Sequence, residues 1–249
     1  MESLLYSFFA GASTVIGAII LIVFGKPGRK TMASLLGFAG GIMMAVSVFE
    51  LMPEAYAFSG SVWVVIIGFL LGCGMMYLLD IFLPHAHMST SDDLTIENRS
   101  HVLETKRVLR TGYLIFFGIA LHNVPEGLAI GAGLEASPEL GLTIALAIGL
   151  HNIPEGLAVA GPLKAGGLSN VKVLLFTLGA GLMTVVGTAI GLLIFGLSTV
   201  FIGGSLAFAA GAMVYIVNDE LIPQANGLHN HLANAGLISG LLIGFAMLM

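Results

Sequence analysis

The chain has 249 residues, of which 57% are hydrophobic and 9% charged, and its fourteen acidic side chains outnumber its nine basic ones. A soluble domain carries roughly 25% charged residues, so lipid rather than water must solvate most of this chain. The composition argues against nucleic-acid binding and against a separate soluble catalytic domain. The single cysteine, Cys73, excludes intrachain disulfides and cysteine-based metal clusters.

In chain order, eight apolar runs are long enough to be membrane spans, since one transmembrane helix needs about 20 apolar residues. They cover residues 4–24, 32–52, 62–83, 111–134, 138–162, 171–196, 199–222 and 232–249. The first run follows an acidic start and is too long for a signal-peptide core, so we expect it to be retained. The sequence therefore predicts an all-α membrane protein in which residues 1–249 form one transmembrane domain.

All Lys and Arg residues fall in or beside the connections after spans 1, 3 and 5, which lie on one side of an eight-span bundle. They are Lys26, Arg29, Lys30, Arg99, Lys106, Arg107, Arg110, Lys164 and Lys172. Because basic connections remain in the cytoplasm, this side is predicted to be cytoplasmic and both termini to lie outside. The expected location is the cell membrane, which is the inner membrane in a Gram-negative organism.

The longest predicted connection, a cytoplasmic loop over 84–110, is polar and carries His85, His87 and His101. His229 and His231, between spans 7 and 8, lie on the same predicted side. Two interpretations stay open: a solvated loop with scattered histidines, or a weak metal-holding or sensing segment.

Two segments of the sequence are repeated. LHNVPEGLAI at 121–130 in span 4 recurs as LHNIPEGLAV at 150–159 in span 5. GFAGGIMMAVSVFELMPEA at 37–55 in span 2 recurs as AFAAGAMVYIVNDELIPQA at 207–225 in span 7. Spans 2 and 7 cross in opposite directions, so spans 1–3 and 6–8 are predicted to be inverted halves around spans 4 and 5. This 3+2+3 arrangement is typical of transporters that alternate between two openings.

Each copy of the first repeat places a histidine and a glutamate four residues apart, on one face of a helix. The groups are His122, Asn123 and Glu126 in span 4, and His151, Asn152 and Glu155 in span 5. These spans are antiparallel and joined by a short turn, so the two motifs are expected to meet near the bilayer centre. Pro125 and Pro154 should kink both helices and expose carbonyl oxygens beside the motifs.

The acidic charges of these motifs require a counter-charge. An ionised side chain at mid-membrane costs about 2.5–3.5 kcal/mol, and no basic residue lies near the middle of a span to pair with it. A divalent cation would balance Glu126 and Glu155, and nitrogen and oxygen ligands without thiolate favour Zn(II), Fe(II), Mn(II) or Cd(II). The alternative is that these side chains only hydrogen-bond the helices together, but duplication of the motif favours a metal site.

Three further acidic residues lie near the ends of spans 2 and 7. The inverted repeat aligns Glu50 with Glu220, which puts Glu50 at the outer mouth and Glu220, with Asp219, at the inner mouth. They are candidate pathway or gate residues, and the alternative is that they face headgroups or water.

With HNVPEG at 122–127, HNIPEG at 151–156 and DELIP at 219–223, the chain resembles the prokaryotic branch of the ZIP (Zrt-, Irt-like) family of divalent metal transporters. The resemblance covers the whole chain. It implies an eight-helix bundle, often dimeric, that moves zinc or related ions toward the cytoplasm. In some members it also implies a binuclear centre built by spans 4, 5 and 6.

One position departs from the binuclear members. Thr184 stands where they carry a span 6 glutamate, so the second metal position loses an anionic ligand. We therefore expect one firm site from the histidines and glutamates of spans 4 and 5, with the two asparagines as auxiliary ligands.

The sequence thus predicts a metal importer rather than an enzyme, with zinc as the transported substrate and looser acceptance of Fe(II), Mn(II) or Cd(II). Its partners are the metal ion, the lipid bilayer and, by the family resemblance, a second copy of the chain, but no nucleic acid. Three alternatives stay open: a metal channel, a metal sensor, or an intramembrane zinc hydrolase, which would need an open water position and a general base.

Overall fold

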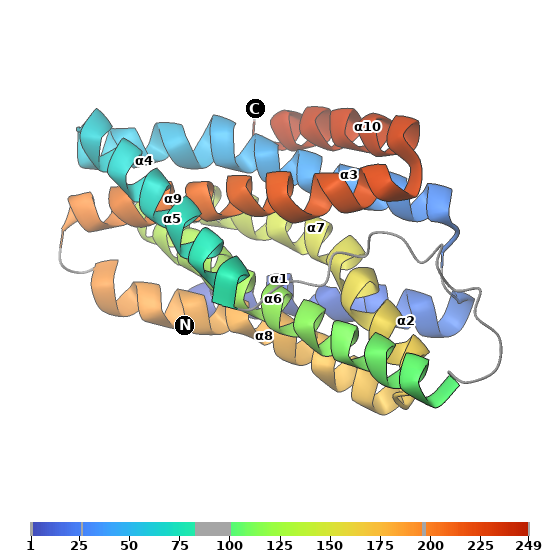
Figure 1. Cartoon of the computed structure of the whole chain (residues 1–249). Helices are drawn as coiled ribbons and strands as arrows, with labels where there is room; N and C mark the ends of the chain where they lie inside the picture. The colour runs from blue at the N-terminus through green and yellow to red at the C-terminus, as the bar shows by residue number, and fades with distance from the viewer. Residues whose placement is uncertain (1, 26, 83–100, 196–197, 249) are drawn as a thin grey trace.

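The computed structural model describes residues 2–25, 27–82, 101–195 and 198–248, and every regular element in these ranges is helical. Four residues discussed above lie outside the described residues: Lys26, His85, His87 and Arg99. The described helices form one bundle of long, roughly aligned rods (Figure 1). Large apolar side chains such as Phe24, Trp63 and Leu193 are exposed on its outside, as a lipid-facing surface requires.

The helices follow the predicted spans closely. The first half contains α1 (Glu2–Ala12), α2 (Thr14–Phe24), α3 (Arg29–Ala45), the π-helical turn η1 (Val46–Leu51), α4 (Met52–Ser59) and α5 (Val62–Phe82). The second half contains α6 (His101–Ala136), α7 (Pro138–Ala165), α8 (Asn170–Phe195), α9 (Thr199–Ile216), the π-helical turn η3 (Val217–Leu221) and α10 (Ile222–Met247).

Seven stretches of the described chain are long and apolar enough to cross a membrane. The longest, Thr199–Met247, contains α9, η3 and α10 and is broken at His229, where the backbone is extended (φ −168°, ψ 102°). The His229 ring restarts the helix, because its Nδ1 atom accepts a hydrogen bond from the Leu232 N–H at 3.3 Å.

Local sequence explains where several helices begin and end. Ser137 is extended and its hydroxyl accepts a hydrogen bond from the Leu140 N–H at 3.1 Å, so it caps α7, whose first residue is Pro138. Gly60 ends α4 in the left-handed region, with φ 63°, and turns the chain into α5.

The two copies of the inverted repeat fold alike. Each contains a π-helical turn, η1 or η3, directly before a helix that has a proline, Pro53 or Pro223, in its first turn. Glu50 lies in η1 and Glu220 in η3. Such turns widen a helix locally and are frequent at functional sites.

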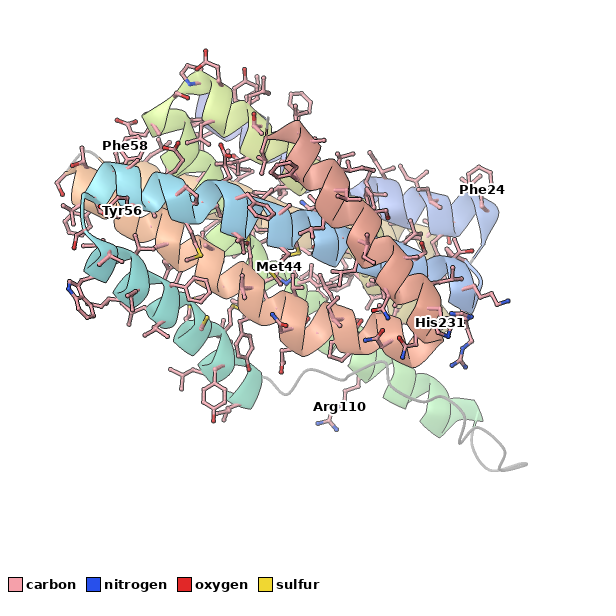
Figure 2. The ribbon with its side chains drawn as sticks, turned by 90° about the horizontal axis from the view of Figure 1, so that it is seen from above. Phe24, Met44, Tyr56, Phe58, Arg110 and His231 are labelled. Atoms are coloured by element: carbon pink, nitrogen blue, oxygen red, sulfur yellow. The ribbon has the colours of Figure 1, made fainter. Side chains whose placement is uncertain are left out.

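The helices also pack in equivalent pairs around the centre of the bundle. α3 lies along α10 and α5 along α9, whereas α6 packs on α8 and α7 packs on α1 and α2 (Figure 1). Seen from above, Tyr56 and Phe58 lie at one end of the bundle and Phe24 and His231 at the other (Figure 2). α6 and α7 therefore pack on each other and on α1, α2 and α8.

Glycines allow the flanking helices to approach this central pair. A Cβ atom at Gly127 would lie 1.9 Å from the Thr184 carbonyl oxygen on α8, and one at Gly156 would lie 1.9 Å from the Thr14 carbonyl oxygen on α2. Each glycine directly follows the glutamate of its motif. Close backbone contact thus holds both motifs against the two halves.

One detail differs from the sequence-based expectation. The loop was predicted to reach residue 110, but α6 begins at His101, because residues 101–110 contain no Gly or Pro and are rich in the helix formers Leu, Lys, Arg and Glu. Pro125 and Pro154 lie inside α6 and α7, which continue through them, and the kinks expected there stay a prediction.

Candidate metal centre

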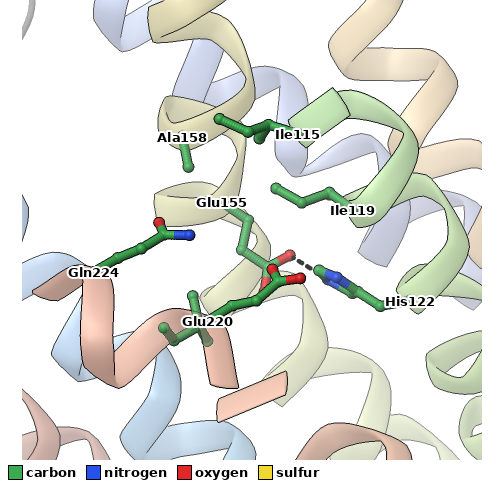
Figure 3. A pocket seen from close by; sticks show the side chains of 8 residues that line it. Ile115, Ile119, His122, Glu155, Ala158, Glu220 and Gln224 are labelled. Carbon is green, nitrogen blue, oxygen red and sulfur yellow. Dashed lines mark hydrogen bonds and ion pairs between the residues drawn. The ribbon is translucent and has the colours of Figure 1, made fainter. Parts of the chain in front are cut away.

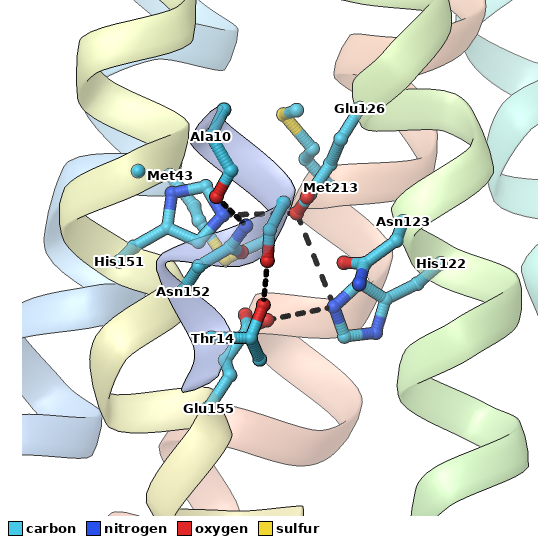
Figure 4. Close-up of polar contacts among 12 residues, drawn as sticks. Ala10, Thr14, Met43, His122, Asn123, Glu126, His151, Asn152, Glu155 and Met213 are labelled. Carbon is cyan, nitrogen blue, oxygen red and sulfur yellow. Dashed lines mark hydrogen bonds and ion pairs between the residues drawn. The ribbon is translucent and has the colours of Figure 1, made fainter. Parts of the chain in front are cut away.

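The six side chains predicted to form a metal site come together where α6 and α7 face each other (Figure 4). All six are buried, with exposed fractions of 0–2%: His122, Asn123, Glu126, His151, Asn152 and Glu155. The structure therefore brings the two motifs together inside the bundle.

The histidines and glutamates pair across the two helices. The His122 Nε2 atom lies 3.1 Å from a carboxylate oxygen of Glu155, and His151 Nε2 lies 2.9 Å from one of Glu126. Within α6, the His122 and Glu126 atoms are 3.9 Å apart. The closest contacts therefore join α6 to α7 in two equivalent, crossed pairs.

These atoms are close enough to share a cation. His122, Glu126 and Glu155 each offer one ligand atom, and all three atoms lie within 4.8 Å of one another. His151 joins this group through Glu126. One further oxygen of each glutamate is buried without a hydrogen-bond partner among the described residues. Unpaired buried carboxylate oxygens are costly, and a bound divalent cation would satisfy them.

The asparagines tie the centre to the two flanking halves. The Asn123 amide nitrogen donates a hydrogen bond to the Ala180 carbonyl oxygen on α8 at 2.8 Å, and the Asn152 amide nitrogen donates one to Ala10 on α1 at 2.9 Å. Their carbonyl oxygens have no hydrogen-bond partner within the described part of the chain. Only these oxygens could serve as the auxiliary ligands that the sequence predicts.

Replacement of Asn152 by Leu is expected to destabilise the protein by about 1–3 kcal/mol, because the buried Ala10 carbonyl loses its donor. Thermal denaturation in detergent measures this as a lower midpoint than for the unmodified protein. The matched control is Asn234→Leu, because Asn234 is exposed on α10 and bonds only to Asn230. Equal midpoints for Asn152→Leu and Asn234→Leu would show that the hydrogen bond from Asn152 to Ala10 does not stabilise the protein.

Thr184 lies beside the centre on α8 and is fully buried. Its hydroxyl oxygen has no hydrogen-bond partner in the described ranges. It can therefore offer an oxygen to a cation but no negative charge, and the expectation of one firm site stays a prediction.

A small pocket leads away from the metal centre, and we call it the Glu220 pocket (Figure 3). Its lining residues are Ile115, Ile119, His122, Glu155, Ala158, Glu220, Leu221 and Gln224. The predicted pathway residue Glu220 thus shares a pocket with two residues of the centre. Gln224 was not singled out from the sequence, although the inverted repeat aligns it with Glu54.

A second, wider pocket lies at the other end of α6 and α7, and we call it the Glu50 pocket. Its lining residues are Glu50, Glu54, Phe58, Ala136, Ser137, Glu139, Leu140, Thr143 and Leu248. None of the six residues of the metal centre lines it. Asp219, the third predicted pathway residue, lines neither pocket.

A helical membrane bundle with an inverted repeat and a buried histidine–carboxylate centre is typical of the class of membrane transporters that carry cations. Residues 83–249 match the ZIP zinc transporter family, to which this chain belongs. The chain is 39% identical over 251 residues to the zinc transporter ZupT of Shigella flexneri serotype 5b, an alignment that covers 99% of this chain and 96% of that protein. It is 38% identical, with the same coverage, to the zinc transporter ZupT of Escherichia coli K12. The family resemblance seen in the motifs is confirmed.

Proposed function

We propose that this chain imports divalent transition-metal ions, with zinc as its principal substrate, through a site formed by the crossed histidine–glutamate pairs. The observation that carries the proposal is the burial of two carboxylates and two imidazoles in mutual contact between α6 and α7. Zinc and related ions favour these ligands. The printed names of the ZupT relatives support zinc as the ion.

The proposed substrate route passes from the Glu50 pocket to the centre and then to the Glu220 pocket. At the centre, Glu126 and Glu155 balance the charge of a dication. His122 and Glu155 belong to both the centre and the Glu220 pocket, so an ion can leave without losing all ligands at once. Alternating exposure of the centre to the two pockets is the expected motion.

We further propose eight spans in the 3+2+3 order, with both termini on the outer side of the cell membrane. The break at His229 supports this count, because it divides the longest apolar stretch into two helical segments. The Lys and Arg residues of the connections after spans 1, 3 and 5 indicate which end of the bundle is cytoplasmic. The Glu220 pocket belongs to this end. Assembly as a homodimer stays a prediction from the family resemblance.

Transport is favoured over hydrolysis by the symmetry of the centre. A catalytic zinc needs three ligands, an open water position and a separate general base. Here each glutamate is paired with a histidine in the same way, so neither is distinguished as a base.

The proposal is tested by uptake of zinc into proteoliposomes that contain the purified protein and a trapped zinc indicator. We expect uptake that saturates with external zinc and is inhibited by Cd(II), Fe(II) and Mn(II), but not by Ca(II) or Mg(II), because the site contains imidazole nitrogen. Uptake no faster than in protein-free liposomes would refute the proposal. A rate that rises linearly with concentration without saturation would indicate a channel instead.

A further inference from the structure

The residues of the Glu220 pocket have counterparts on the opposite side of the metal centre. The register of the first repeat aligns the apolar wall residues in three pairs: Ile115 with Ile144, Ile119 with Ile148, and Ala158 with Ala129. Each pair is identical in residue type. The sequence thus contains two equivalent sets of these apolar wall residues, one on each side of the centre.

The polar residues of the pocket follow the same rule. His122 and Glu155 correspond to His151 and Glu126, which form the second crossed pair. The inverted repeat aligns Glu220 and Leu221 with Glu50 and Leu51. Of the eight residues that line the Glu220 pocket, seven therefore have a chemically identical counterpart, and only Gln224 differs, since it is aligned with Glu54.

The two equivalent sets differ in their exposure. Ile115 and Ile119 retain exposed fractions of 7% and 6%, whereas Ile144 and Ile148 are fully buried at 0%. Leu221 is 5% exposed and its counterpart Leu51 is 0% exposed. The side chains on the Glu220 side therefore retain slight exposure, whereas their counterparts on the Glu50 side are fully packed.

The fully buried set is adjacent in sequence to residues of the Glu50 pocket. Leu140 and Thr143 line that pocket, and Ile144 is the next residue of α7. Glu50 lines the pocket, and Leu51 follows it in η1. These packed apolar residues would have to move apart to join the Glu50 pocket to the His151–Glu126 pair.

We propose that Leu51, Ala129, Ile144 and Ile148 part in the alternate state of the transport cycle to open an outward chamber, in which Glu54 acts as an additional cation-attracting residue. This inference rests on the proposed function. Two related halves of nearly equal sequence can exchange conformations, so the side that is closed in this structure takes the form of the open side.

The two chambers would differ in charge. The Glu50 pocket contains three carboxylates, from Glu50, Glu54 and Glu139. The aligned positions on the other side are Glu220, Gln224 and Arg110, and the Arg110 side chain is exposed and points away from the bundle (Figure 2). A pocket lined by charges of one sign raises the local concentration of ions of the opposite sign. The outward chamber should therefore capture a dication at lower concentration than the inward one.

The chamber is tested by labelling single cysteines in a Cys73→Ser background, with a membrane-impermeant thiol reagent applied outside right-side-out vesicles. We expect Ile148→Cys to be labelled and its inward counterpart Ile119→Cys to remain unlabelled. Ser61→Cys, in the turn between α4 and α5, is the labelled control. Ala209→Cys, fully buried in α9 and outside both pockets, is the unlabelled control.

Failure of this inference and failure of the proposed function are distinguishable, because zinc uptake is measured for each variant. If Ile148→Cys stays unlabelled while it still takes up zinc and Ser61→Cys reacts, no outward chamber forms and the inference is overturned. If Ile148→Cys does not fold or transport, Ala129→Cys provides the same test from α6, with the same two outcomes.

The role of Glu54 is tested by the kinetics of Glu54→Gln, which gives the residue found at the inward position. We expect the KM for external zinc to rise about three- to tenfold at low ionic strength with an unchanged maximal rate, because capture weakens and the central ligands remain. The control is Glu135→Gln, which removes an exposed carboxylate of α6 that lines neither pocket. An unchanged KM for Glu54→Gln would overturn this assignment, whether or not the labelling result holds.

Discussion

Proteoliposomes containing the Glu126→Gln, Glu155→Gln double variant are expected to take up no zinc above the level of protein-free liposomes. Both carboxylates are fully buried, and together they carry the two negative charges that balance a dication. Glutamine keeps the size of the side chain but removes the charge, and an uncompensated dication at this depth is strongly unfavourable. Each single variant should lose at least about 100-fold in uptake, since outer-shell partners alone are worth 10- to 100-fold.

The double variant should nevertheless fold. The contacts of His151 with Glu126 at 2.9 Å and of His122 with Glu155 at 3.1 Å can be kept as neutral hydrogen bonds to a glutamine. Size-exclusion chromatography and thermal denaturation in detergent check this point. Glu135→Gln, at an exposed position of α6, should transport normally. Unimpaired uptake by the double variant would show that the metal does not bind between α6 and α7.

Gly127→Ala is expected to destabilise the protein by about 3 kcal/mol or more, at the upper end of the range for overpacked cores. The added Cβ atom would lie 1.9 Å from the Thr184 carbonyl oxygen, and that atom belongs to a helix backbone that cannot rotate away. α6 and α8 would have to separate, and Glu126, the preceding residue, would move with α6. We therefore expect a lower thermal midpoint together with a large loss of zinc uptake.

A glycine of α5 provides the control. A Cβ atom at Gly74 would meet no heavy atom of another helix within 4 Å, so Gly74→Ala should be neutral or slightly stabilising through its better helix propensity. Gly156→Ala repeats the test on the equivalent contact, where the added atom would lie 1.9 Å from the Thr14 carbonyl oxygen. If Gly127→Ala and Gly74→Ala denature at the same temperature, close packing of α6 on α8 is not essential.

Much of the helical architecture could be predicted because the solvent is lipid. A chain in hydrocarbon must satisfy its backbone within helices, so long apolar runs mark the spans. Helix boundaries and helix types were predicted less well where the hydropathy of the chain does not determine them. The helix that begins at His101 extends beyond the apolar run, and the turns at Glu50 and Glu220 are π-helical, which hydropathy does not encode.

The residues of the centre could also be predicted, but their partners could not. Spacing placed His122 and Glu126 on one face of a helix and brought the two motifs together, but it did not specify that His122 lies nearer to Glu155 of the other helix than to Glu126. The Asn123 amide nitrogen donates to α8, a contact that the sequence did not predict, while its role as an auxiliary ligand through the carbonyl oxygen stays a prediction. Such choices depend on how two helices rotate and approach each other, and a single helix carries no information about this.

By itself, the sequence determined the membrane environment, the duplicated HNxPEG motif and the alignment of Glu50 with Glu220, because hydropathy and repetition are properties of the chain alone. Only the tertiary structure decided the crossed pairing in the centre and the side on which the centre is accessible. The two halves are so alike in sequence that either side could be open. In this structure Ile144 and Ile148 are fully buried, whereas Ile115 and Ile119 retain slight exposure and line the pocket beside His122 and Glu155.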